Sequence, residues 1–420
     1  MIKISPFKAL RPAPGKEGAI ISPPYDVIDT ETAREQAEGN PLSFLRVIRS
    51  EIEFPPDSNP YDKAVYERAR DNLNRLQKNG DLIREENPAL YIYRLERGGH
   101  TQTGLVARHH VEDYLSEKIK KHELTRRDKE DDRTRHVDTL GANTGLIFLT
   151  FRASRAQQIA GALSAIVAES KPLYDVLRGD GVRHIIYRID DSKKIEELTE
   201  LYRNVEALYI ADGHHRAASA ARAAGLHRER AGTFSGDEDF NWFLGVSFPD
   251  EELRIYPYNR VVKDLNGHSA EDFLEKLEEN FEVVAEHAEP APRQMGLFLG
   301  GKWYTLKARD ALYQANSANE KLDVSILQKY VLQPLLGIDD PRTSERIAFI
   351  GGLDSEPVLE AKVKSGEYAL AFSLYPTTPQ ELEDIADAGE IMSPKSTWFE
   401  PKLCSGFIIN EISATRIGNG

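Results

Sequence analysis

The sequence predicts a mixed α and β protein, and three features support this prediction. Short apolar runs typical of buried strands alternate along the chain with stretches whose apolar residues recur at helical spacing. Clusters of glycine and proline separate these stretches. A length of 420 residues with 40% hydrophobic residues leaves room for two domains, each with its own core.

The first 250 residues show helix and strand signals in turn. A helix is expected from Asp62 to Lys78, where the apolar residues fall on one face. The runs on either side of Gly98 and Gly99 predict a β-hairpin. A second amphipathic helix is expected from Ser192 to Tyr202. The character of the chain then changes, with a helix capped by Ser269 and a hairpin around a Gly-Gly pair. We therefore expect a boundary near residue 250, with residues 251–420 forming a C-terminal α+β domain that closes a cleft.

Charge and composition exclude several classes of protein. A formal net charge of −14 argues against a general nucleic-acid binder, because such proteins neutralise phosphates with cations. Cys404 is the only cysteine, so an intrachain disulfide and a thiol-rich metal site are both excluded. We find no apolar run long enough to span a membrane and no apolar signal-peptide core, so a cytoplasmic protein is expected. The oligomeric state is not indicated.

A candidate phosphate site lies where a strand is expected to turn into a helix, at Asp212, Gly213, His214, His215 and Arg216. The free N–H groups and the dipole of a helix start attract anions, and a guanidinium matches phosphate oxygens. The histidines would add proton transfer, although adjacent helical residues point about 100° apart, so at most one would face a ligand fully. Alternatively, one histidine caps the helix and the other packs against the sheet.

A second cluster lies in the highly charged segment from Lys121 to Asp138. If this segment is helical, steps of four place Thr125, Lys129 and Arg133 on one face. Together with His122 and Glu123 they would suit a magnesium–nucleotide, with the glutamate near the metal and the cations on the phosphates. A solvated face held by ion pairs four residues apart is an equal alternative.

Two further segments could contribute to a site. Asp26 follows Pro-Pro-Tyr, which would hold its carboxylate in a defined direction, as a general base requires. A turn in which Asp26 caps its own backbone is the alternative. Near the C-terminus, Lys395, Ser396, Thr397 and Lys402 supply the hydroxyls and positive charge common at phosphate and carboxylate sites. An interdomain clasp would explain them equally well.

Four sequence blocks together resemble a known family. They are SPPYDVI, HELTRRDKEDDR, LYIADGHHR and IMSPKSTWFEPKLCSGF. The resemblance is to a bacterial and archaeal family long described as of unknown function, some members of which are identified as free L-serine kinases. That family is similar to the ParB/sulfiredoxin-like group, whose Gly-x-His-Arg motif cradles phosphate, and residues 213–216 fit this motif in register. The resemblance implies a ParB/sulfiredoxin-like nucleotide-binding core in residues 1–250.

The resemblance also implies roles for individual residues. Glu123 and Arg126 match the first and last positions of the Glu-Asn-x-x-Arg helix that handles phosphates and metal in ParB-like proteins, with Leu124 in place of the asparagine. Related archaeal serine kinases carry a glutamate base early in the chain, and Asp26 occupies a similar early location, with an aspartate in place of the glutamate. His215 is a further candidate for proton transfer.

These roles together imply a phosphotransferase. It would use Mg²⁺ and either ATP or ADP to convert L-serine into O-phospho-L-serine. The alternative is a ParB-like nucleotide-binding switch or regulator that transfers nothing to an amino acid.

Overall fold

The computed structural model describes residues 1–314, 317–352 and 355–412. The chain forms two compact units, one of Met1–Glu252 together with the chain from Pro401, and one of Leu253–Glu400. Both contain helices and strands, so the predicted mixed α and β class is confirmed. The tail from Pro401 differs from the expected C-terminal domain because its backbone pairs with the first unit, at Ser405 with Ser22 and at Ile409 with Leu10.

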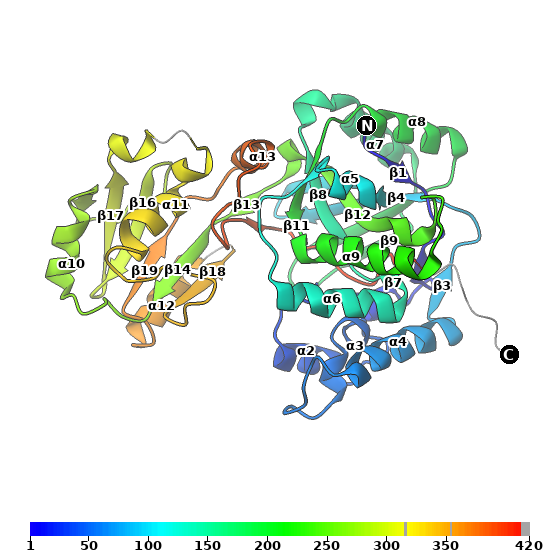
Figure 1. Ribbon diagram of the computed structural model, residues 1–420, viewed down its shortest axis with the longest axis horizontal. Helices are drawn as coiled ribbons and strands as arrows, with labels where there is room; N and C mark the ends of the chain where they lie inside the picture. Colours follow the sequence, from blue (N-terminus) through cyan, green and yellow to red (C-terminus); the bar gives the residue numbers. More distant parts are fainter. Residues whose placement is uncertain (315–316, 353–354, 413–420) are drawn as a thin grey trace. The chain divides into compact units, whose positions relative to one another are not determined.

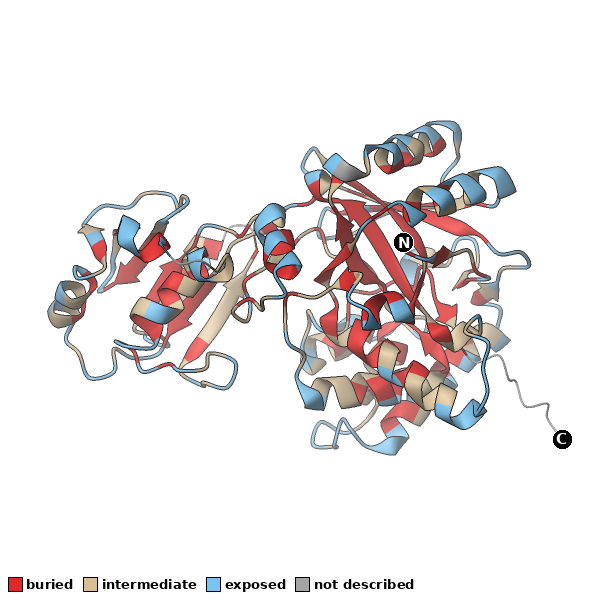
Figure 2. Ribbon diagram, turned by 45° about the horizontal axis from the view of Figure 1, so that its top comes forward, coloured by how far each residue is buried: buried red, intermediate tan, exposed pale blue. Residues whose placement is uncertain are grey.

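The first unit is built on a nine-stranded sheet in the order β6-β11-β8-β12-β5-β4-β10-β9, with β1 beside β5. β11 runs parallel to β6 and β12 parallel to β8, whereas the other neighbours are antiparallel. Figure 2 shows that these central strands are largely buried. The strands are β1 (Ile4–Ser5), β4 (Leu90–Arg97), β5 (His100–His110), β6 (Ile119–Lys120), β8 (Ile147–Phe151), β9 (Tyr174–Leu177), β10 (Arg183–Ile189), β11 (Leu208–Asp212) and β12 (Trp242–Pro249).

Helices complete the first unit in layers. Apolar side chains of α7, α8 and α9 share one core with strands β5 and β8, where Leu163, Tyr202 and Ala217 are almost completely buried. Helix α6 packs on α9, and α4 packs on α6, so the helices are stacked (Figure 1). The expected hairpin and both expected helices of this half are present as β4–β5, α4 and α8. The longer helices are α4 (Lys63–Lys78), α6 (Arg127–Leu140), α7 (Gln157–Glu169), α8 (Ser192–Arg203) and α9 (His214–Ala231).

A second core of the first unit lies under its short helices. Phe44, Leu73 and the tail residue Ile409 meet there, so the N-terminal helices and the tail depend on each other. The short elements are β2 (Leu10–Pro12), α1 (Glu17–Ile20), α2 (Thr30–Ala37), α3 (Leu45–Ile48), β3 (Leu82–Arg84), α5 (Val111–Leu115), β7 (Ala142–Asn143) and β21 (Asn410–Glu411).

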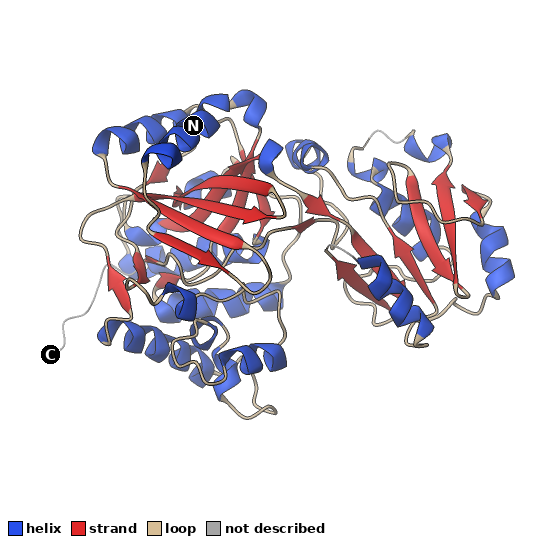
Figure 3. Ribbon diagram, turned by 180° about the vertical axis from the view of Figure 1, so that it is seen from behind, coloured by secondary structure: helices blue, strands red, loops and turns tan. Residues whose placement is uncertain are grey.

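The second unit is a six-stranded antiparallel sheet in the order β15-β17-β16-β19-β14-β18, with α12 packed on it (Figure 3). Leu359 of α12 packs with Val261, Phe298 and Ala371 of the strands. The expected Ser269 cap and Gly-Gly hairpin are present at α10 and β16–β17. The elements are β13 (Ile255–Tyr256), β14 (Tyr258–Val262), α10 (Ala270–Leu277), β15 (Phe281–Val284), β16 (Gln294–Leu299), β17 (Lys302–Ala308), α11 (Asp323–Leu327), β18 (Ile347–Gly351), α12 (Ser355–Lys364), β19 (Leu370–Ser373), α13 (Pro379–Asp387) and β20 (Trp398–Phe399).

The centre of the first sheet tolerates no side chain at Gly245. A Cβ there would lie 2.8 Å from the ring of His109 and 3.0 Å from a methyl group of Leu149, both buried. We expect Gly245→Ala to lower the free energy of unfolding by about 1–3 kcal/mol, the usual cost of overpacking. Gly161→Ala in α7 is the control, because its Cβ would meet nothing within 4 Å. A gain of up to about 1 kcal/mol from better helix propensity is expected for the control. Urea unfolding measures the free energy of unfolding of both variants. A Gly245→Ala variant as stable as the wild type would contradict this packing.

Asp323, at the start of α11, makes the stability of the second unit depend on pH. Its carboxylate accepts hydrogen bonds from the Tyr313 hydroxyl at 2.7 Å and from the backbone N–H of Arg293 at 3.0 Å. Burial nevertheless raises the pKa of Asp323 from 3.8 to about 6. Because the folded protein binds this proton more tightly than the unfolded chain, the stabilisation is complete below pH 3.8 and is lost as the pH rises through 6.

We therefore expect wild-type stability to fall between pH 4 and 6, relative to Asp323→Asn, by roughly 2 kcal/mol. The comparison with the variant removes the titration of all other carboxyl groups. Thermal unfolding of both proteins at pH 4, 5, 6 and 7 tests this expectation. Parallel pH profiles for the two proteins would show that Asp323 is not the group responsible.

Candidate functional site

The candidate site is built around the junction of β11 with α9. The strand ends at Asp212, and Gly213 forms the N-cap of α9 with a φ of +99° and no side-chain cap. A Cβ on Gly213 would lie 2.9 Å from Nε of Arg216, so both the backbone angle and the space require glycine. The N–H groups at the start of α9 are therefore not covered by a capping side chain, and the helix dipole favours an anion there.

Arg216 joins the strands to two carboxylates. Its Nη1 donates to the carbonyl of Leu146, and its Nη2 lies 3.2 Å from Oδ2 of Asp212 and 3.6 Å from Oδ2 of Asp26. The side chain is 11% exposed. Burial opposes its charge, yet Asp26 and Asp212 hold the pKa of Arg216 above its usual value. Arg216 therefore holds the two carboxylates in place rather than standing open as the expected phosphate fork, although its buried Nε has no hydrogen-bond partner among the described residues.

Lys402 adds a second cation from the returning tail. Its Nζ lies 3.6 Å from Oδ2 of Asp212. Lys395, Ser396 and Thr397 belong instead to the second unit, so the C-terminal block of the sequence is divided between the units. Buried Arg260 donates to the carbonyl of Lys395 at 3.0 Å, and Ser396 donates to the carbonyl of Ser393. A role of residues 395–397 in substrate binding stays a prediction.

The two adjacent histidines both turn towards the loop that follows β6. Nε2 of His214 accepts a long hydrogen bond of 3.4 Å from the backbone N–H of His122. Nε2 of His215 accepts one of 3.1 Å from the backbone N–H of Arg126. Burial lowers the pKa of His214 well below its usual value, so its ring is neutral at pH 7. The pair therefore holds residues 122–126 against the start of α9.

Helix α6 begins later than the sequence pattern suggested, which corrects one prediction. It starts at Arg127, so Thr125 lies in the preceding loop and does not share a helical face with Lys129 and Arg133. The Thr125 hydroxyl donates to Glu130 at 2.8 Å. Lys129 reaches the hydroxyl of Tyr61 at 3.2 Å. Six residues at the start of the segment form no helix because Arg126, which N-caps α6, has an extended backbone.

The cations of this segment consequently point in different directions. Arg126 is exposed and pairs with Asp128 at 2.9 Å. Arg133 is almost buried, pairs with Asp132, and lies 4.3 Å from the ring centroid of Tyr25. Of these cations, Arg133 therefore stands beside the loop that carries Asp26.

The Pro-Pro-Tyr-Asp loop is held by hydrogen bonds from Arg49, a residue that the sequence patterns did not single out. Arg49 donates to the carbonyls of Tyr25 at 2.8 Å and Ile28 at 3.1 Å. The Asp26 carboxylate is 34% exposed and faces Arg216, which favours a directed carboxylate over a self-capping turn. Burial, and then the charge of Asp26, raise the pKa of Tyr25 above its usual range.

A cavity of about 40 Å³ lies beside the guanidinium of Arg216. Its polar lining includes Tyr25, Arg133, Asn143, Arg216 and Ser405, all in the first unit. This volume holds a few water molecules and is too small for a nucleotide. Asp26 and Asp212 are not part of this lining, and both carboxylates are partly exposed.

Comparison with known proteins gives a family. Residues 4–325 match the family described as a protein of unknown function, DUF1015, and the chain belongs to that family. No curated protein matches the chain. No helix among the described residues is both long and apolar enough to cross a bilayer.

Solved structures give distant matches. A conserved hypothetical protein from Pyrococcus furiosus is 16% identical, with a TM-score of 0.33, over 72% of this chain and 95% of its own. A free serine kinase in complex with AMP is 16% identical, with a TM-score of 0.33, over 70% and 86%. SbnI with a C-terminal truncation from Staphylococcus aureus is 12% identical, with a TM-score of 0.39, over 71% and 85%. Likenesses this distant do not establish a shared function.

The contacts of Arg216 predict a coupled contribution to stability. Arg216→Ala leaves the carboxylates of Asp212 and Asp26 without their guanidinium, and we expect a loss of about 2 kcal/mol, less than for fully buried pairs. The control is Arg222→Ala on the same helix, whose side chain is 43% exposed and whose loss should be within about 0.5 kcal/mol. In Arg216→Ala/Asp212→Asn, the losses should fall short of additivity by about 1 kcal/mol. Denaturant unfolding measures the cycle, and strict additivity would show that Arg216 and Asp212 do not interact.

Proposed function

We propose that the protein is a small-molecule kinase that transfers a phosphoryl group from ATP or ADP to the hydroxyl of free L-serine, giving O-phospho-L-serine. One observation supports this proposal above others: the uncapped start of α9 lies beside two cations and two partly exposed carboxylates. The choice of serine rests on the resemblance of the four sequence blocks to free serine kinases. The alternative, a nucleotide-binding switch, would use the same anion site without an acceptor.

The start of α9 would bind the phosphates of the donor. The N–H groups of its first turn provide hydrogen bonds, and the helix dipole adds positive potential. Lys402 and Arg216 supply full charges near this point, which would stabilise negative charge on the transferring group. Gly213 permits close approach because it has no side chain. Phosphoryl transfer needs chiefly positioning and charge, and this arrangement offers both.

Asp26 is the proposed general base. The serine hydroxyl oxygen attacks the terminal phosphorus, the bond to the leaving nucleotide oxygen breaks, and the hydroxyl proton moves to the Asp26 carboxylate. Arg216 and Arg49 would keep that carboxylate and its loop in position. Glu123 and His215 remain the other predicted catalytic residues, although Nε2 of His215 already accepts a hydrogen bond from Arg126.

Mg²⁺ would accompany the nucleotide. Its preferred ligands are oxygens, and Asp212 offers a carboxylate oxygen close to Arg216 and Lys402, whereas Asp26 is kept as the base. The Asp212 carboxylate fits the ion, which would neutralise phosphate charge when bound. Glu123 was the predicted magnesium ligand, but its neighbours are imidazoles, a donor set that suits other metals better.

The proposal predicts that Asp26→Asn lowers kcat/KM by about 10²–10⁴, because the base is lost while the binding groups remain. O-Phosphoserine should form with wild-type protein, L-serine, Mg²⁺ and either ATP or ADP, and mass spectrometry detects it. Nucleotide affinity of the variant, measured by calorimetry, should stay close to wild type. Asp57→Asn is the matched control, because Asp57 is exposed and lies outside the site.

One result would exclude the kinase, and another would exclude only its proposed base. Absence of O-phosphoserine with both nucleotides excludes it, and tight nucleotide binding that is independent of serine then favours the regulatory switch. Full activity in Asp26→Asn would leave the kinase standing but remove Asp26 as its base.

A further inference from the structure

His122 is a buried histidine with poorly satisfied ring nitrogens. It is 2% exposed, and neither Nδ1 nor Nε2 makes a hydrogen bond of good geometry within the described part of the chain, although the backbone of Ile210 lies close enough to favour the protonated ring. A buried imidazole normally satisfies at least its N–H, because burying an unpaired polar group costs free energy. Leucine or phenylalanine would fill this space without that cost. The Ile210 backbone can serve one ring nitrogen at most, so the other, without a hydrogen bond of good geometry among the described residues, points to a ligand.

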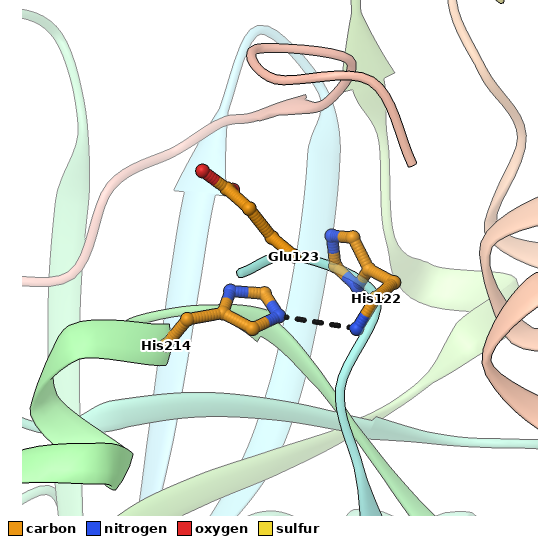
Figure 4. A group of neighbouring side chains, drawn as sticks. All are labelled: His122, Glu123 and His214. Atoms are coloured by element: carbon orange, nitrogen blue, oxygen red, sulfur yellow. Dashed lines mark hydrogen bonds between the residues drawn. The ribbon is translucent and has the colours of Figure 1, made fainter. Parts of the chain in front are cut away.

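Two other potential ligands lie beside it. Glu123 is the next residue, and His214 approaches from the start of α9 (Figure 4). The rings of His122 and His214 are 4.4 Å apart between centroids and perpendicular, at 87°. One ligand atom from each of the three residues can be chosen so that all lie within 4.8 Å of one another.

This spacing is close to that of a metal site. Three atoms within 4.8 Å of one another surround a point no more than about 2.8 Å from each, whereas zinc bonds to nitrogen and oxygen are about 2.0–2.2 Å long. Each ligand atom would therefore have to move inward by less than about 1 Å to reach bonding distance. His214 can do so by giving up its 3.4 Å hydrogen bond to His122, which is long for an N–H to nitrogen contact.

The chemistry of the donors selects the class of ion. Imidazole nitrogens suit zinc, copper, iron, cobalt and nickel, whereas Mg²⁺ and Ca²⁺ require oxygen cages. Glu123 carries a negative charge, and Asp212 lies near enough to interact electrostatically with both histidines. These charges oppose the repulsion between a cation and the start of α9.

We propose that His122, Glu123 and His214 form a binding site for a divalent transition-metal ion such as Zn²⁺ or Co²⁺. Three protein ligands leave a coordination position open, as in catalytic rather than structural zinc sites. Its occupant would be water or an anionic oxygen. The site does not depend on the proposed kinase activity, and it forms within the first unit alone.

The test is metal binding by the full-length protein in the absence of nucleotide and serine. Chelator-treated protein, freed of the chelator, is titrated with Co²⁺ and followed by its visible d–d absorption, and then with Zn²⁺ by calorimetry. One equivalent should bind, and millimolar Mg²⁺ should not displace it. Glu123→Gln and His122→Asn should each weaken binding at least about tenfold. His227→Gln is the control, because it removes a histidine from the same helix outside the cluster.

The two ligand variants are chosen to separate binding from folding. Glu123 is only partly buried, so Glu123→Gln should unfold at the wild-type temperature, and its binding decides the matter if His122→Asn is unstable. Wild-type protein that takes up no Co²⁺ or Zn²⁺, or a Glu123→Gln variant that binds as tightly as wild type, would overturn the site. Because no nucleotide is present, neither result bears on the kinase.

Discussion

The candidate site depends on one buried guanidinium. Arg216 bridges the carbonyl of Leu146, at the start of β8, to the carboxylates of Asp212 and Asp26. Three segments that are distant in the sequence are thereby held together by the positive charge of one side chain. A buried cation with no such partners would be costly, so the two carboxylates offset the cost of burying the charge of Arg216, and Arg216 in turn fixes the direction of each carboxylate. The positions of Asp26 and the start of α9 follow from this mutual requirement.

The two histidines extend this order to the next segment. His214 and His215 accept backbone N–H groups of His122 and Arg126, so the loop before α6 is held by side chains from α9. Because both imidazoles bond to backbone N–H groups, they fix the loop, and the acidic groups of the site are not needed for this. Asp26, Asp212 and Glu123 thus keep oxygens near the start of α9, where an anionic ligand and its metal ion would meet.

Local patterns in the sequence predicted much of this. The strand, the glycine turn and the helix at residues 208–231 follow from a short apolar run, a glycine and an alanine-rich stretch, all read over a few neighbouring residues. The hairpin at Gly98–Gly99 and the helix capped by Asp62 were likewise predicted from a few neighbouring residues. Predictions failed where a distant contact decided the outcome. Residues 121–126 form no helix where His214 and His215 of α9 bond to the backbone of His122 and Arg126, and the tail pairs with Leu10 and Ser22, which no nearby residue signals. Arg49 was missed for the same reason, since its carbonyl partners are more than 20 residues away.

The return of the tail to the first unit also orders events during synthesis. The second unit, Leu253–Glu400, is an insertion whose two ends pair with each other through Ile255 and Phe399. A growing chain therefore completes this whole insertion before Lys402, Ser405 and Ile409 leave the ribosome. Until then Asp212 lacks its second cation, and the core around Phe44 lacks Ile409. The nascent protein consequently carries an unfinished candidate anion site while the insertion is being made, and the returning tail completes it.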